Sequence, residues 1–363
     1  MGSVWDPPFM EAYKNLLEKK EETRNNNNNN EVVADVVEEC ELPVIDLSQL
    51  EAREEEAREE CKSQIARASE EWGFFQVVNH GISGDILKRL RWEEEKAFKE
   101  PFDVKTREEN NYFSAGAYRW GSPTATCIKQ LSWSEAFHIP LTDIIASNNN
   151  NDNNNNNIPS NNNTLRLIME HFASRVSKLA ERIAEILAEK MGDKSSFIKE
   201  NCLPDTCYMR LNRYPACPVR ARCGDEIING LMAHTDSDFL TILYQDHQVG
   251  GLQLVKDGKW IAVKPNPEAL IVNIGDLFQA YSNGLYKSVY HRVVTNPISE
   301  RFSTAYFFCP SSDTVIDSFT KPSLYRKFNF REYRQQVRHD VCTLGSKIGL
   351  PRFLLTHHHH QPA

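Results

Sequence analysis

Hydrophobic and polar positions follow two periods along the chain, and the change between them falls near residue 206. From Leu165 to Leu187, apolar side chains recur at steps of three and four residues, the period of an amphipathic helix that ends near Gly192. Packing in a core explains this apolar face better than binding of a cofactor does. Charged segments predict further helices over residues 51–71, 85–99 and 329–345.

After residue 206 the chain consists of short segments rich in β-branched and aromatic residues, separated by Gly, Pro, Asn and Asp. One pair of segments is joined by KDGK at Lys256–Lys259, which is a hairpin signal. Six or more strands without intervening helices predict an antiparallel barrel or jelly roll, with the helices packed outside it.

Two segments near the N-terminus have the same β-type composition. Residues 42–50 (LPVIDLSQL) predict a buried strand that ends in a cap, and residues 72–81 (WGFFQVVNHG) predict a second strand closed by a turn. With the helices between and after them, they form an N-terminal α/β region. The predicted fold is therefore mainly β with flanking helices, a jelly-roll core and an N-terminal α/β region.

Two asparagine-rich stretches, Asn25–Asn30 and Asn148–Asn163, interrupt the patterned segments. Neither has enough apolar surface to offset the entropy lost on ordering, so both are predicted to be disordered. The predicted parts are a partly disordered leader (1–40), an N-terminal module (41–147), the insert (148–163), a helix plus jelly roll (164–342) and a tail (343–363).

Composition and charge narrow the classes of function. The 363 residues, 40% of them hydrophobic, suffice for a large core. Acidic residues outnumber basic ones by 50 to 42, so neither nucleic acid nor an anionic membrane is an expected partner. No apolar run reaches the roughly 18 residues of a membrane span, and the first residues lack the apolar core of a signal peptide. We expect a soluble cytoplasmic or nuclear protein whose nine scattered cysteines are reduced.

Three residues of the β-rich region have the spacing of a metal site. His234 and Asp236 stand two apart in one predicted strand and so point to one face, and a later strand begins with His291. Two imidazoles and one carboxylate on one side of an octahedron leave three positions open, as in non-haem Fe(II) oxygenases. An isolated HxD pair also has structural explanations, so this interpretation depends on further residues.

Two more pairs of residues share a strand face in the same region. Arg301 and Ser303 form one pair, and a guanidinium fork with a hydroxyl is a selective clamp for a carboxylate. Asn212 and Tyr214 form the other pair and could donate hydrogen bonds to the same ligand. Three same-face pairs in one β region predict a small-molecule site rather than scattered surface residues.

Other acidic and histidine residues are assigned structural roles. Asp238 lies on the predicted strand face of Asp236, but the ligand set is complete without it. Asp276 and Asp46 are predicted to be turn or cap residues. The run His357–His360 is predicted to be a low-complexity tail that binds divalent metals loosely, and not the active centre.

Together these motifs resemble those of the plant 2-oxoglutarate and Fe(II)-dependent dioxygenases, over about residues 41–342. The motifs concerned are HTD at His234–Asp236, His291, RFS at Arg301–Ser303, NRYP at Asn212–Pro215 and WGFFQVVNHG at residues 72–81. Within that family, RWGSP at residues 119–123 and LSWSEAFHIPL at residues 131–141 are similar to gibberellin 2-oxidases, particularly the branch that acts on twenty-carbon gibberellins. The long asparagine insert departs from the family pattern at a loop position.

The resemblance implies a double-stranded β-helix of the cupin type. It implies that His234, Asp236 and His291 bind Fe(II), with 2-oxoglutarate and O2 as cosubstrates and ascorbate as an activator. The residues that would hold the distal carboxylate of 2-oxoglutarate are Arg301, Ser303, Tyr214 and Asn212.

The implied reaction is hydroxylation of a gibberellin at carbon 2, on the β face, which inactivates the hormone or its twenty-carbon precursor. A rigid, apolar, carboxylated substrate calls for aromatic walls and at least one cationic or hydroxyl donor. Candidates on that basis are Tyr112, Tyr118, Arg119, Trp133, Glu135 and Phe239. Aromatic residues at this density more often belong to a core.

Two alternatives stay open. Gibberellin 20- or 3-oxidases and flavonoid-type oxygenases share all the metal and cosubstrate residues, and only residues 119–141 speak against them. A catalytically silent protein that binds a small hydrophobic acid is expected to have lost a ligand residue, whereas this chain keeps the full set.

Overall fold

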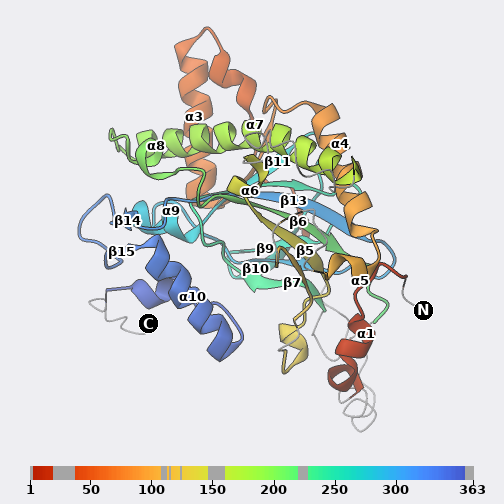
Figure 1. Ribbon diagram of the computed structural model, residues 1–363. Coiled ribbons are helices and arrows are strands. Elements are labelled where there is room, and N and C mark those ends of the chain that lie inside the picture. The colour runs from red at the N-terminus through yellow and green to blue at the C-terminus, as the bar shows by residue number, and fades with distance from the viewer. Residues whose placement is uncertain are drawn as a thin grey trace, which may run out of the picture.

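The computed structural model describes residues 3–18, 37–107, 113, 116–122, 125–145, 160–219 and 228–355. Two β-sheets lie at the centre of the molecule, with helices on either side of them (Figure 1). No helix in this described part of the chain is long and apolar enough to cross a membrane. Several sequence predictions concern residues outside it, namely Asn25–Asn30, residues 148–159, Tyr112 and His357–His360.

The larger sheet includes both strands that the sequence predicted near the N-terminus, at residues 42–50 and 72–81, and has eight strands in all. In spatial order they are β2 (Val44–Asp46), β3 (Phe74–Val78), β11 (Leu270–Ile274), β8 (Leu240–Gln245), β13 (Arg301–Phe308), β6 (Tyr208–Tyr214), β5 (Glu135–Pro140) and β4 (Tyr118–Trp120). Each strand presents one row of side chains to the helices and the alternate row to the other sheet.

The smaller sheet has five strands and provides two of the three predicted metal ligands. Its spatial order is β1 (Glu39–Cys40), β10 (Lys259–Val263), β9 (Leu252–Lys256), β12 (His291–Val294) and β7 (Asn229–His234), and a separate pair is formed by β14 (Val315–Ile316) and β15 (Phe328–Asn329). The predicted hairpin joins β9 to β10, and Asp257 and Gly258 at its tip have φ of 49° and 76°, as a type I′ turn requires. The two sheets form the predicted jelly-roll core.

Strands from both predicted modules belong to the larger sheet. β3 pairs with β11, and β5 pairs with β6 along its whole length. The asparagine-rich insert therefore separates two stretches of sequence but not two independent sheets. The long helix α7 (Ser160–Lys190) begins at Ser160 rather than at residue 164, inside the predicted insert.

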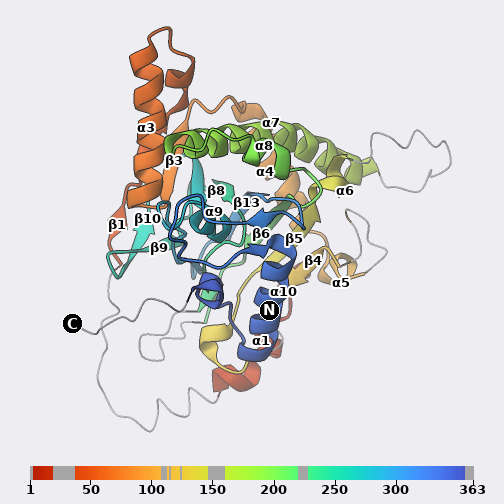
Figure 2. The ribbon, with the colours of Figure 1, turned by 90° about the vertical axis from the view of Figure 1, so that its left-hand side faces the viewer.

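Helices on the outer face of the larger sheet complete the main core. Helices α3 (Glu55–Glu71) and α4 (Gly84–Phe98) pack against α7, which lies across that face (Figure 2). The predicted apolar face of α7 is buried there. The remaining helices are α1 (Phe9–Ala12), α5 (Phe102–Lys105), α6 (Leu141–Ile145), α8 (Phe197–Asn201), α9 (Asp276–Tyr281) and α10 (Phe330–Leu344), with 3-10 turns at Leu47–Glu51, Ile128–Gln130 and Leu350–Phe353.

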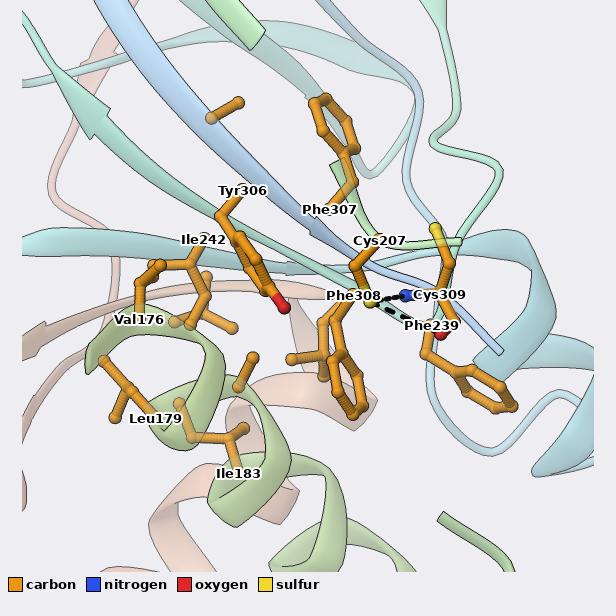
Figure 3. Packing of buried hydrophobic residues seen from close by; sticks show 14 of the residues in the cluster. Val176, Leu179, Ile183, Cys207, Phe239, Ile242, Tyr306, Phe307, Phe308 and Cys309 are labelled. Carbon is orange, nitrogen blue, oxygen red and sulfur yellow. Dashed lines mark hydrogen bonds between the residues drawn. The ribbon is translucent and has the colours of Figure 1, made fainter. Parts of the chain in front are cut away.

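Packing between α7 and the sheet explains the predicted apolar period. Val176, Leu179 and Ile183 of the helix point toward Tyr306 and Ile242 of the strands (Figure 3). All five side chains are buried. This face belongs to the hydrophobic core, as the sequence predicted.

Asp46 has the predicted capping role. Its carboxylate accepts a hydrogen bond from the backbone N–H of Ser48 (2.9 Å) at the start of the turn Leu47–Glu51. Helix α10 is capped in the same way by Asn329 and ends at Gly345, which adopts a left-handed φ of 74°. The predicted helix over residues 329–345 is thus confirmed together with its end signals.

Both ends of the described chain pack against the barrel. In the leader, the Phe9 ring stacks on Trp133 with 4.6 Å between centroids, and the Tyr13 hydroxyl donates to the carbonyl of Ser132 (3.1 Å). Beyond α10, Leu350 and Phe353 are buried, so this part of the predicted tail belongs to the folded domain. Helices α1 and α10 lie on the side of the sheets away from α7 (Figure 1).

Two leucines on α7 test how much of the stability comes from this core. Leu187 is fully buried and Leu167 is 46% exposed. We expect Leu187→Ala to lower the free energy of unfolding by about 2–5 kcal/mol, because it removes buried methyl groups and leaves a cavity. The same substitution at Leu167 should change it by no more than about 0.5 kcal/mol. Urea denaturation followed by circular dichroism measures both, and equal effects would contradict the packing described.

Candidate active site

The three predicted metal ligands lie together between the two sheets. His234 ends β7, His291 begins β12, and the two residues are paired in register. One Asp236 carboxylate oxygen, Oδ1, lies 3.4 Å from Nε2 of His234 and 3.7 Å from Nε2 of His291. These three ligand atoms are close enough to hold one metal ion.

Asp236 does not lie on the strand that was predicted for it. β7 ends at His234, and residues 235–239 cross from the smaller sheet to β8 of the larger one. The strand ends at this crossing, because the chain leaves the smaller sheet there and no longer lies beside the strands with which it was paired. The loop nevertheless brings the Asp236 carboxylate to the same side as both imidazoles. The sequence therefore predicted the right group of three residues, but the reason given, that His234 and Asp236 share one strand, was wrong.

Backbone carbonyls fix the orientation of both imidazoles. Nδ1 of His234 lies 2.7 Å from the carbonyl oxygen of Met232, and Nδ1 of His291 lies 3.0 Å from that of Val289. A carbonyl oxygen can only accept, so each Nδ1 carries the proton and each Nε2 presents a lone pair. Burial lowers the pKa of His291 to about 4, helped by the nearby His234, so this imidazole is neutral at pH 7.

Two side chains of the larger sheet hold the Asp236 carboxylate. Its Oδ2 atom accepts hydrogen bonds from the Thr241 hydroxyl (2.6 Å) and from the Asn273 amide (2.8 Å). Burial opposes ionisation, but the adjacent histidines and these donors outweigh it and hold the pKa of Asp236 well below its usual range. The carboxylate is therefore charged, and Oδ1 is the atom left to face a metal.

Asp238 is buried beside this carboxylate but is not part of the ligand group. Burial, and after it the charge of Asp236, raises the pKa of Asp238 well above its usual value. Its Oδ2 lies 2.9 Å from the Thr241 hydroxyl oxygen. The single hydroxyl hydrogen of Thr241 is thus shared between the carboxyl groups of Asp236 and Asp238, with the shorter distance to Asp236. Asp238 is thus linked to the Asp236 carboxylate through the Thr241 hydroxyl.

The predicted carboxylate clamp is assembled by β6 and β13. Arg301 pairs with Tyr214 across these strands, and Ser303 pairs with Asn212. The Arg301 guanidinium carbon lies 5.3 Å from the centroid of the Tyr214 ring, and the Asn212 amide donates to the Ser303 hydroxyl (3.4 Å). All four predicted residues are buried.

The guanidinium of Arg301 retains unused hydrogen-bonding capacity. Its Nη2 donates to Gln245 (3.4 Å), but within the described structure Nε and Nη1 are buried without a partner. Leaving such donors unpaired in a protein interior costs about 1–3 kcal/mol or more each. A dicarboxylate that accepts from this guanidinium removes that cost, so the residues present fit 2-oxoglutarate.

Strand β8 connects the two halves of the site. Thr241, Leu243 and Gln245 point to one face of β8, because every second residue of a strand points the same way. Thr241 lies beside the metal ligands, and Gln245 lies beside Arg301. At about 3.3 Å per residue, the α-carbons of Thr241 and Gln245 are about 13 Å apart. The ligand group and the clamp thus adjoin the two ends of one strand face, with the apolar Leu243 between Thr241 and Gln245.

The predicted substrate residues are not brought together around this site. Phe239 is fully buried among the aromatic rings of the main core, and Trp133 packs under the leader. Glu135 is buried in ion pairs with Lys105 (2.5 Å) and Arg213 (2.6 Å). These three predicted residues have no surface to offer a substrate, because core packing and charge pairing already use their side chains.

Two of the predicted substrate residues do have exposed atoms. Tyr118 is half-buried, and its hydroxyl donates to the Glu135 carboxylate (2.6 Å), whereas Arg119 is exposed. Tyr112 lies outside the described residues. Tyr118 and Arg119 therefore remain candidates for contact with a substrate.

Sequence reasoning missed the residues that support the ligands. Thr241 of β8 and Asn273 of β11 are polar residues with apolar neighbours on both sides in the strand, and both are buried. A polar side chain in such a position needs a buried partner, and that rule was the signal available in the sequence.

This fold, ligand group and clamp define a non-haem iron oxygenase that uses a dicarboxylate cosubstrate. The pattern of the 2OG-Fe(II) oxygenase superfamily matches residues 206–310, and that of the non-haem dioxygenase N-terminal region, named for morphine synthesis, matches residues 42–161. The chain belongs to the 2OG-Fe(II) oxygenase superfamily, and its cofactor is iron with 2-oxoglutarate as cosubstrate.

Within the superfamily the chain is similar to particular plant enzymes. It is 59% identical to gibberellin 2-beta-dioxygenase 8 of Arabidopsis thaliana, over 96% of this chain and 98% of that one. It is 44% identical to gibberellin 2-beta-dioxygenase 6 of Oryza sativa subsp. japonica, over 96% of each chain. Among solved structures, JOX2 in complex with 2OG, Fe and JA has a TM-score of 0.67 and 32% identity, covering 85% of this chain and 88% of that one.

Helix α4 braces the outer face of the strand that carries the clamp. Arg91 donates to the carbonyl of Phe302 (3.1 Å), between Arg301 and Ser303, and pairs with the buried Glu94 (3.3 Å). Burial raises the pKa of Glu94 to about 7, and the Arg91 charge opposes this only in part. The pKa of this buried acid is thus close to neutral pH.

The raised pKa of Glu94 predicts how stability depends on pH. Between its unfolded pKa of about 4.3 and its folded pKa of about 7, the folded state binds more protons, so its contribution to stability falls as pH rises through this window. We expect Glu94→Gln to reduce the loss of unfolding free energy between pH 5 and pH 8 by an amount of order 3 kcal/mol at most. Glu60→Gln, at an exposed position of α3, is the control. Identical pH profiles for Glu94→Gln and wild type in urea titrations would refute the assignment.

Proposed function

We propose that the protein is a gibberellin 2-beta-dioxygenase, which uses 2-oxoglutarate and O2 to hydroxylate gibberellins at carbon 2. The observation that carries the proposal is the presence of both parts of the site: the His234, Asp236 and His291 group and the buried, unpaired donors of Arg301. The nearly full-length similarity to enzymes named for this reaction supports the substrate class.

Each residue of the site has one task in this proposal. His234, His291 and Asp236 hold Fe(II) through two Nε2 atoms and Oδ1. Iron with 2-oxoglutarate and O2 supplies the oxidising chemistry, and ascorbate keeps the metal reduced. Arg301 and Ser303, with Tyr214 and Asn212 beside them, hold and orient the distal carboxylate of 2-oxoglutarate through charge-assisted hydrogen bonds.

The surrounding residues keep the site dry and its charges fixed. Arg301 is buried on all sides by β6, β8 and β13, so its attraction to a carboxylate is only weakly screened by water. The chain provides positioning and exclusion of water, and no side chain is required as a general base. Tyr118 and Arg119 are the proposed contacts for the apolar, carboxylated substrate.

The substrate is a small molecule, and we infer a cytoplasmic or nuclear location. The net charge of −8 disfavours nucleic acid and anionic membranes as partners. The eight cysteines of the described chain are free thiols, which fits a reducing compartment.

A gibberellin 20- or 3-oxidase or a flavonoid-type oxygenase is the second candidate, because the metal and cosubstrate residues are the same. The similarity to 2-beta-dioxygenases over nearly the whole chain disfavours it. A silent binding protein is disfavoured by the intact ligand group.

The proposal predicts a defined product. With Fe(II), ascorbate and 2-oxoglutarate, the protein should form succinate and add one oxygen atom at carbon 2 of gibberellins, with twenty-carbon precursors tested beside nineteen-carbon ones. Mass spectrometry and nuclear magnetic resonance identify the position. Asp236→Ala should abolish turnover and keep the fold, whereas Asp103→Ala, at an exposed site, should leave turnover unchanged. Succinate without a gibberellin product would retain the iron site and reject the hormone, and oxygen at carbon 3 or 20 would favour the second candidate.

The clamp predicts a selective effect on the cosubstrate. Arg301→Met removes a buried bidentate donor whose hydrogen bonds to a charged group are worth about 1.5–3 kcal/mol each, so the KM for 2-oxoglutarate should rise about 100-fold or more. Arg331→Met, a matched change at an exposed residue, should not alter it. If the KM for 2-oxoglutarate is unchanged in folded Arg301→Met, the clamp assignment is wrong.

A further inference from the structure

The segment that follows α10 reaches the loop of the metal ligand Asp236. The side chain of Lys347 is largely covered there, and its ammonium group donates to the carbonyl of Thr235 (2.9 Å) and to the hydroxyl of Ser237 (2.8 Å). Thr235 and Ser237 are the two residues that flank Asp236 in the chain. The ammonium group also pairs with the carboxylate of Asp276 (2.7 Å). All three N–H donors of Lys347 thus have an acceptor.

Asp276 holds the same loop from the start of α9. Its Oδ2 accepts from the Thr235 hydroxyl (3.0 Å) and from the Tyr333 hydroxyl of α10, in addition to Lys347. Its backbone N–H donates to the carbonyl of Asp236 (3.0 Å). The sequence predicted only a turn or cap residue at this position, but the side chain joins the metal loop, α9, α10 and the C-terminal segment.

The ion pair between Lys347 and Asp276 differs from an ordinary surface ion pair. The side chains of Lys347 and Asp276 are 10% and 3% exposed, whereas Lys321, which pairs with Asp317 nearby in the chain, is 57% exposed. A buried charge is costly unless it is fully paired, and removing one partner leaves the other uncompensated. The pair therefore specifies one position for the loop, because only that position satisfies every donor and acceptor.

We propose that Lys347 and Asp276 are positioning residues of the metal centre, which set its metal affinity by fixing the backbone on both sides of Asp236. This inference rests on the proposed role of the His234, Asp236 and His291 group as the iron ligands. Residues that orient metal ligands typically change metal affinity 10- to 100-fold when they are replaced. The C-terminal segment, predicted from sequence to be a tail, thereby belongs to the metal site.

Metal binding measured without turnover tests this inference. The full chain, with His357–His360 replaced by alanine so that this run does not bind metal, is titrated anaerobically with Co(II) and followed by d–d absorption and calorimetry. We expect Lys347→Met to raise the Kd for Co(II) about 10- to 100-fold. Lys321→Met, the same change at the exposed ion pair, should leave it unchanged. At saturating Fe(II), the KM for 2-oxoglutarate should change little, because the clamp is on other strands.

A double-mutant cycle separates positioning from general destabilisation. Asp276→Asn should also weaken Co(II) binding, and Lys347→Met combined with Asp276→Asn should be less than additive, because both act on one loop. Lys347→Arg keeps the charge and several donors and should recover part of the affinity. It also serves as the test variant if Lys347→Met does not fold.

Three results would overturn the inference. The first is a wild-type Kd for Co(II) in folded Lys347→Met, or in folded Lys347→Arg and Asp276→Asn if the Met variant does not fold. The second is a lowered melting temperature with no change in Kd, which would identify a purely structural ion pair. The third is a wild-type chain that binds no Co(II), which would reject the metal ligands of the proposed function and this inference with them, and is distinguishable from the first two.

Discussion

The placement of one buried carboxylate is the constraint on which the site depends. Asp236 lies where the chain crosses from the smaller sheet to the larger one, and Thr241 and Asn273 of the larger sheet hold one of its oxygens. The other oxygen faces the two histidines of the smaller sheet. A charge in this interior is tolerable because two donors of the larger sheet hold it, and the ligand group brings residues of both sheets together.

Close backbone approach around this carboxylate leaves little freedom for substitution. A Cβ atom on Gly275 would lie 2.0 Å from a carboxylate oxygen of Asp238 and 2.2 Å from its carbonyl oxygen. At the clamp, a Cβ atom on Gly230 would lie 2.5 Å from the Tyr214 ring. Glycine is required at both positions because the neighbouring residues of the site occupy the space that a side chain would need.

Buried charged residues outside the site hold the N-terminal leader against the barrel. Arg213 of β6 pairs with Glu135 of β5 (2.6 Å) and with Asp6 of the leader (2.8 Å), while Lys105 also donates to the carbonyl of Trp5 (2.8 Å). These pairs fix the leader against the barrel at one end, as Lys347 fixes the C-terminal segment at the other. In both cases a residue distant in sequence pairs with a buried charged side chain.

The sequence by itself determined the elements, the family and the chemical groups. The change of period near residue 206, the hairpin at Asp257 and Gly258, and the motifs containing His234, His291 and Arg301 are all local patterns. The structure confirms the strands and the hairpin, and it pairs His234 with His291 and Arg301 with Tyr214. Only the tertiary structure decided which side chains are free to act. Glu135, Trp133 and Phe239 were predicted from the sequence to contact the substrate, but their side chains are buried in core packing and ion pairs. Lys347 was predicted to belong to the C-terminal tail, but it contacts the loop of the metal ligand Asp236. The physical reason is that burial and pairing depend on contacts between residues far apart in the chain, and no local pattern records them.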